Sequence, residues 1–286
     1  MKKFLALLIA VISIFSLLTF SSCDKTNDKV IAVSIVPYQT FVKEIVKDKF
    51  TVEVAVPSGQ SPETYEPKPK EVVNLNLSKI YFSVGIPNEE ITIIPSLNTS
   101  VKVIKIAPLL VNSGLPDRHF DNGARDPHIW LSIKRAIKTV EIMLNEIIKI
   151  DSENAEFYTE NANNYINKLN SLYNELTAKF SSVSDSKRKM IVYHPSFGYF
   201  ANEFNITMYA IENEGHEVTA KDILNAINYA NANGIKTIFY QAETDSANAV
   251  AFANEVGGEA IMLNPLSGDY INNLRGMANA ILSYYE

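Results

Sequence analysis

Three residues of this chain carry side chains that could bind a divalent metal ion together. Glu63, His128 and His194 lie far apart in the sequence, and each stands next to a proline that stiffens its loop. Imidazole nitrogen and carboxylate oxygen are ligands that zinc prefers and that manganese tolerates. Ligands from three distant segments come together only when the whole chain folds. Such a site suits capture and release of an ion better than a local structural role.

The size and charge of the chain exclude some classes of function. Its 286 residues are enough for two domains with sizeable cores. The formal net charge is −6 and the pI is ≈ 5.4. Because the chain is acidic overall, a nucleic-acid partner has no electrostatic support.

The amino terminus has the layout of a secretory signal. Two lysines precede an apolar stretch over residues 4–20, which is short for a membrane span. The single cysteine, Cys23, follows two serines and precedes a polar stretch, which resembles a bacterial lipoprotein signal. We therefore predict a signal peptide over residues 1–22 and a lipidated tether over 23–29. An uncleaved anchor or a buried thiol is the alternative, and one cysteine allows no disulfide within the chain.

The first half of the mature chain alternates between strand and helix patterns, which predicts an α/β domain with a parallel sheet. The apolar run that begins at Val30 is typical of a strand buried on both faces, and Pro37 ends it. Residues 115–125 form a polar stretch that predicts an exposed loop. Strands are expected at 30–36, 51–56, 79–84 and 101–106, and helices at 41–47 and 70–77.

The second half repeats this pattern after a long helical segment. Helical spacing runs from residue 133 to about 182, with a break near Asp151. A coiled-coil partner helix is the alternative, but strict heptads are not sustained. Further strands are expected at 190–193, 207–211, 236–240 and 260–263, and helices at 197–203, 220–233 with Gly234 as C-cap, 247–255 and 270–284. We predict an α/β fold whose two lobes have parallel-type sheets flanked by helices, divided as 30–150, a linking helix at 151–183, and 184–286.

The chain contains four motifs that stand in the same order in a known protein family. It resembles the solute-binding lipoproteins of bacterial zinc and manganese ABC importers over essentially all of the mature chain. That family's first metal loop reads Pro-Gly-x-x-Pro-His-x-Tyr-Glu-Pro-x-Pro, and its second reads Asp-Pro-His-x-Trp-Leu. The corresponding segments here are 57–69, 126–131, 192–200 (a strand, a histidine and an aromatic helix start), and 211–217 with 263–266.

The resemblance implies two lobes joined by one long rigid helix, with the metal in the cleft between them. It implies Glu63, His128, His194 and Asn264 as the metal ligands. Two of these depart from the family pattern, because Glu63 stands where a histidine is usual and Asn264 where an aspartate is usual. Asn264 offers only a neutral amide oxygen, which is a poor zinc ligand. Zinc is the expected ion and manganese the next choice.

Three classes of function remain open from the sequence. The first is an extracytoplasmic binding protein, a monomer held in the periplasm or at the cell surface by lipid, which delivers its ion to an ABC permease. The second is a zinc hydrolase, since two histidines and a glutamate also hold catalytic zinc, although the chain has no His-Glu-x-x-His motif. The third is a metal-independent, adhesin-like lipoprotein with a degenerate site. We assign no ligand role to His119, His216 or Gln241.

Overall fold

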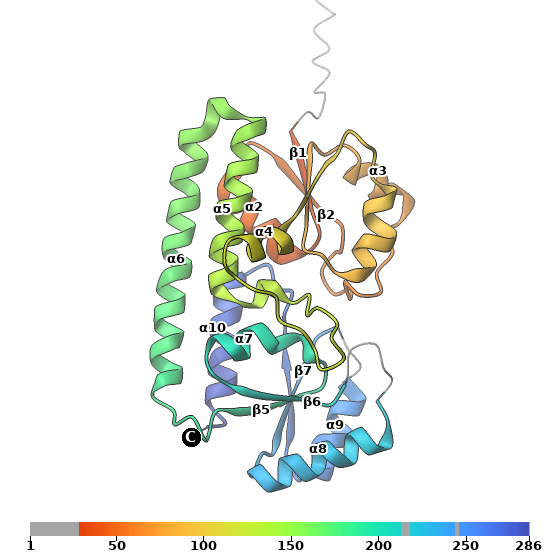
Figure 1. Ribbon diagram of the computed structural model, residues 1–286, viewed down its shortest axis with the longest axis vertical. Helices are drawn as coiled ribbons and strands as arrows, with labels where there is room; N and C mark the ends of the chain where they lie inside the picture. Colours follow the sequence, from red (N-terminus) through yellow and green to blue (C-terminus); the bar gives the residue numbers. More distant parts are fainter. Residues whose placement is uncertain (1–28, 213–217, 244–245, 286) are drawn as a thin grey trace, which may run out of the picture.

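The computed structural model describes residues 29–212, 218–243 and 246–285. The predicted signal peptide, the lipidation site Cys23 and His216 lie outside the described residues. Two parallel sheets lie one above the other, and the long helix α6 (Ala155–Ser181) runs along one side of both (Figure 1). Within the described ranges, no helix is long and apolar enough to cross a membrane.

The first sheet has the strand order β2-β1-β3-β4, and every neighbouring pair is parallel. All four residues of the central strand β1 are buried, as its continuous apolar run predicts. The strands are β1 (Val30–Val33), β2 (Thr51–Val54), β3 (Ile80–Ser83) and β4 (Lys102–Lys105), with helices α2 (Val36–Val46), α3 (Pro69–Leu75) and α4 (Ile106–Asn112).

The second sheet repeats this order as β6-β5-β7-β8, again with parallel pairs throughout. Gly234 ends α8 with a φ of 66°, which confirms the predicted left-handed C-cap. The strands are β5 (Lys189–Val192), β6 (Thr207–Ala210), β7 (Thr237–Gln241) and β8 (Glu259–Leu263), with helices α7 (Gly198–Glu203), α8 (Ala220–Asn233), α9 (Ser246–Glu255) and α10 (Tyr270–Leu282).

The long helical segment is a helical hairpin whose second arm links the two lobes. Helix α5 (Ile133–Ile150) is followed by a 3-10 turn, and then by α6 (Ala155–Ser181), so the predicted break near Asp151 is confirmed. Helix α6 contacts α5, α2 and α10 of the same chain. Because these helices cover its apolar face, α6 needs no coiled-coil partner.

Two local features differ from the sequence prediction, and proline explains both. Strand β1 ends at Val33, and Pro37 lies in the first turn of α2 rather than at the end of a longer strand. Helix α4 was not predicted because Pro108 interrupts its apolar run. Proline fits the first turn of a helix, since the amide that it lacks has no partner within the helix there.

One hydrophobic core continues through both lobes. It includes buried residues of α2, α5, α6, α10 and both central strands. Phe41 of α2 meets Tyr270 of α10 edge to face, with ring centroids 4.9 Å apart. The indole Nε1 of Trp130 donates to the carbonyl oxygen of Pro265, which follows β8, at 2.8 Å. These contacts bring the carboxyl ends of both sheets toward one junction, which is where parallel sheets usually bind ligands.

Candidate metal centre

Glu63 lies in the loop that joins β2 to α3. The backbone amide of Tyr65 donates to the carbonyl oxygen of Ser61 at 3.0 Å, and the Glu63 amide donates to the Ser61 hydroxyl at 3.3 Å. From the neighbouring segment, the side chain of Asn88 donates to the Tyr65 carbonyl at 2.8 Å. These bonds hold the turn so that the half-buried Glu63 side chain points between the lobes.

His128 lies just before α5, in the motif Asp126-Pro127-His128. Its side chain is 6% exposed, and its Nδ1 lies 2.8 Å from Oδ1 of Asp126. The same oxygen accepts the His128 backbone amide at 3.0 Å, and Arg118 pairs with the other oxygen at 3.2 Å. An ionised carboxylate only accepts hydrogen bonds, so Nδ1 carries the proton and Nε2 is left for an ion.

His194 lies two residues after the end of β5, and its ring is held in the same way as that of His128. Its side chain is 3% exposed, and its Nδ1 lies 3.1 Å from Oε2 of Glu212, which comes after the neighbouring strand β6. Because β5 and β6 are parallel, residues that follow their carboxyl ends lie at one edge of the sheet. Both imidazoles therefore have a carboxylate behind them, an arrangement that orients metal-binding histidines.

The three predicted ligands form one compact group. Glu63, His128 and His194 each place a donor atom within 4.8 Å of the other two. Oε1 of Glu63 lies 3.2 Å from Nε2 of His194 and 3.6 Å from Nε2 of His128. Ligands at about 2.0–2.2 Å from a zinc ion stand roughly 3.3–3.6 Å apart in a tetrahedron. The donor set and its spacing therefore fit a tetrahedral zinc ion with one further position.

Mutual pairing sets the charge state of this group. Burial disfavours the charged form of Glu63, but hydrogen bonds from His128 and His194 outweigh it and hold the pKa of that carboxyl well below its usual range. Burial likewise opposes charge on His194, yet Glu212 and Glu63 raise its pKa to about 10. Asp126 and Glu63 raise the pKa of His128 against the same opposing burial. A bound cation would displace the imidazole protons, because a metal binds neutral imidazole.

A small cavity adjoins the group, between the lobes. Its volume is ≈ 10 Å³, which is about the space of one water molecule. Among the described residues that line it there is no lysine or arginine. The lining residues are Ser61, Pro62, Glu63, Ile86, His128, Trp130, Gln241, Glu243, Pro265 and Leu266.

Asn264, the fourth residue that the resemblance implied, lies at the margin of this cavity. It precedes Pro265 and Leu266, which line the cavity, but is not itself in the lining. Its side-chain oxygen accepts the backbone amide of Leu266 at 2.9 Å, and its carbonyl oxygen accepts the side chain of Asn273 at 2.6 Å. The hydrogen bond to Leu266 closes a turn at the end of β8.

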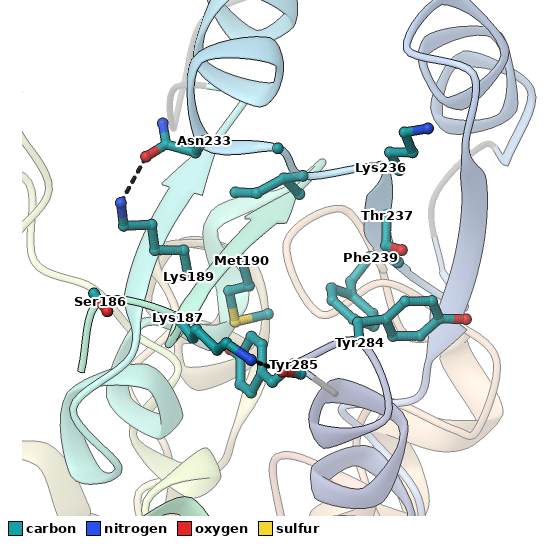
Figure 2. Close-up of a pocket in the computed structure, with 12 residues that line it drawn as sticks. Ser186, Lys187, Lys189, Met190, Asn233, Lys236, Thr237, Phe239, Tyr284 and Tyr285 are labelled. Atoms are coloured by element: carbon teal, nitrogen blue, oxygen red, sulfur yellow. Dashed lines mark hydrogen bonds between the residues drawn. The ribbon is translucent and has the colours of Figure 1, made fainter. Parts of the chain in front are cut away.

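Larger hollows lie elsewhere, away from the compact group of Glu63, His128 and His194. Figure 2 shows one of ≈ 410 Å³ at the amino ends of β5 and β7, on the opposite edge of the sheet from His194. Lys189 donates to the side chain of Asn233 there, and Lys187 donates to the carbonyl oxygen of Tyr285. Among the residues that the structure describes, its lining contains lysines and tyrosines but no acidic residue or histidine. A second hollow includes His119 in the loop before Asp126, outside the compact ligand group.

The sequence analysis assigned no role to Asp126, Glu212 or Glu243. Asp126 was visible as part of its motif, and Glu212 stands in a segment that the resemblance covers. For neither Asp126 nor Glu212 does the sequence indicate which imidazole the carboxylate contacts. Glu243 had no local signal at all, because it follows a strand in a stretch without a motif.

Comparison with known proteins shows which family this chain belongs to. The sequence model of the family described as "ZnuA: Zinc-uptake complex component A periplasmic" matches residues 31–284. The chain belongs to this family. It is 28% identical to the high-affinity zinc uptake system protein ZnuA of Bacillus subtilis (strain 168), over 87% of this chain and 82% of that protein.

Two further relatives extend the comparison. The chain is 30% identical to the zinc-binding protein AdcA of Streptococcus pyogenes serotype M3, over 94% of this chain but only 57% of the longer relative. A crystal structure of a ZnuA deletion mutant with zinc bound superposes with a TM-score of 0.83 at 30% identity, covering 90% of this chain and 98% of that one. The two-lobed fold of this chain is therefore that of the family.

Proposed function

We propose that this protein captures zinc outside the cytoplasm and delivers it to an ABC permease. The observation that carries the proposal is the group of Glu63, His128 and His194, whose donor atoms have the spacing of tetrahedral zinc ligands. Membership of a family described as a periplasmic zinc-uptake component supports it, as does the likeness to relatives named for zinc uptake.

In this proposal Glu63, His128 and His194 are the protein's ligands, and Asn264 is a candidate for the remaining position. The set contains two nitrogen donors and a carboxylate, which favours zinc and leaves manganese as the second choice. The ligands come from different loops of both lobes, and the ion would therefore bridge the junction between them.

The two other classes fit less well. A hydrolase needs space for a substrate beside the metal, and the adjoining cavity holds about one water molecule. An adhesin with a degenerate site would not need both imidazoles oriented by buried or half-buried carboxylates, as they are here. We infer that the protein is a binding protein and not an enzyme.

We also propose that a lipid on Cys23 holds the protein, as a monomer, at a bacterial membrane. The motivation is the lysine-flanked apolar stretch that ends in Ser21-Ser22-Cys23. Cys23→Ala should release the protein from membranes or block its processing. A variant that fractionates and migrates like the parent would show that the lipoprotein interpretation is wrong.

Thermal melting with added zinc tests the proposed function. A ligand that binds only the folded state, at a hundredfold excess over Kd, stabilises it by about 2.7 kcal/mol. For a chain of this size that corresponds to a rise in Tm of roughly 5–10 °C. His128→Ala and His194→Ala should abolish the rise, and His119→Ala, outside the ligand group, should keep it. A parent protein whose Tm does not respond to any first-row divalent ion would contradict the proposal.

A further inference from the structure

Glu243 lies beside the candidate metal centre, on the side of the second lobe. It follows the carboxyl end of β7, which pairs with β5, the strand that His194 follows. It lines the small cavity together with Glu63 and His128. Two carboxylates thus face one water-sized space from opposite lobes.

The surroundings of Glu243 leave one of its two carboxyl oxygens without a partner. Its Oε2 is buried and has no hydrogen-bond partner in the structure. A carboxylate oxygen buried in this way is destabilising unless a donor or a cation meets it. The cavity lining described here has no lysine or arginine, and the imidazole of His128 already pairs with Asp126 and Glu63. A bound divalent cation would meet the buried oxygen of Glu243.

The competing residue, Asn264, is less suited to the position. Its side-chain oxygen already accepts the Leu266 amide, and Asn264 does not line the cavity. An amide oxygen is also neutral, whereas a second carboxylate beside Glu63 would balance both charges of a zinc ion bound to neutral imidazoles.

We propose that Glu243 is the fourth ligand of the metal ion, completing a site with Glu63, His128 and His194. This inference rests on the proposed function. In the structure Glu243 lies outside the three-residue group whose donor atoms are within 4.8 Å of one another. Its carboxylate therefore approaches the ion by rotation about the side-chain torsions, and Asn264 remains a turn residue.

The test compares four variants of the protein by two measurements. Zinc affinity comes from competition with a chromophoric chelator, and the coordination of the metal from the visible spectrum of the cobalt(II)-substituted protein. Glu243→Gln should weaken zinc binding by at least about tenfold and change the cobalt spectrum, because a charged ligand is lost. Glu243→Asp should bind more tightly than Glu243→Gln. Asn264→Ala and the control Glu255→Gln, an exposed change at the end of α9, should match the parent.

Each contrary result has a distinct meaning. Suppose that zinc-free Glu243→Gln has the melting temperature of the zinc-free parent and keeps the parent's zinc affinity and cobalt spectrum. Glu243 is then not a ligand, and the proposed function stands. Weaker zinc binding with an unchanged cobalt spectrum also overturns ligation, since Glu243 would then act without touching the ion. If Asn264→Ala, and not Glu243→Gln, weakens zinc binding and changes the cobalt spectrum, the fourth ligand is Asn264. A parent protein that binds neither zinc nor cobalt overturns the proposed function itself.

Discussion

The carboxylates behind the two imidazoles offer a quantitative test of how the site is built. Asp126 meets Nδ1 of His128 and Glu212 meets Nδ1 of His194, so each fixes the ring that presents Nε2 to Glu63. Removing such a partner typically costs 10–100-fold in metal affinity, or about 1.4–2.7 kcal/mol at 25 °C. We expect Glu212→Gln to fall near the tenfold end, because its side chain is 26% exposed and water can replace part of its role.

Asp126→Asn should have the larger effect. Its side chain is fully buried, and it also holds Arg118 and the backbone amide of His128. Loss of this charge leaves the Arg118 guanidinium without its partner, so the zinc-free protein should also unfold at lower denaturant concentration. Glu212→Gln should change the unfolding midpoint little.

The assay is zinc competition titration together with urea unfolding of the zinc-free proteins. Asp121→Asn is the matched control, because Asp121 is exposed in the loop before Asp126. It should leave both quantities unchanged. A folded Asp126→Asn protein that binds zinc as tightly as the parent would refute the reasoning that this carboxylate orients a ligand.

Two further predictions concern the ligand Glu63 and the junction of the lobes. Glu63→Ala should lose most of its zinc affinity in calorimetric titration. Glu63→His should retain zinc and discriminate more strongly against manganese, because imidazole suits the harder ion less well. Unchanged zinc binding by Glu63→Ala would show that Glu63 is an ordinary loop carboxylate. Trp130→Phe removes the hydrogen bond to the Pro265 carbonyl and should lower the free energy of unfolding by about 1 kcal/mol. Urea unfolding monitored by circular dichroism measures this change. An unchanged unfolding midpoint would show that this hydrogen bond between the lobes makes no net contribution to stability.

The sequence by itself determined most of the secondary structure and which residue types are candidate metal ligands. Strand and helix patterns are local, so the buried run at Val30 and the cap at Gly234 could be recognised without knowing what packs against them. The histidines were identifiable because each lies in a short motif with a proline beside it. Proline also caused the errors, since its effect depends on whether a helix begins there, as at Pro108.

Only the tertiary structure decided which groups come together at the candidate metal centre. Glu212 meets His194 because β5 and β6 pair in parallel, and Glu243 reaches the same edge because β7 pairs with β5. These residues are far apart in the sequence, and no local pattern records which strands are neighbours. The distances from Glu63 to both imidazoles exist only because the core shared by the two lobes holds the loops of both in one place.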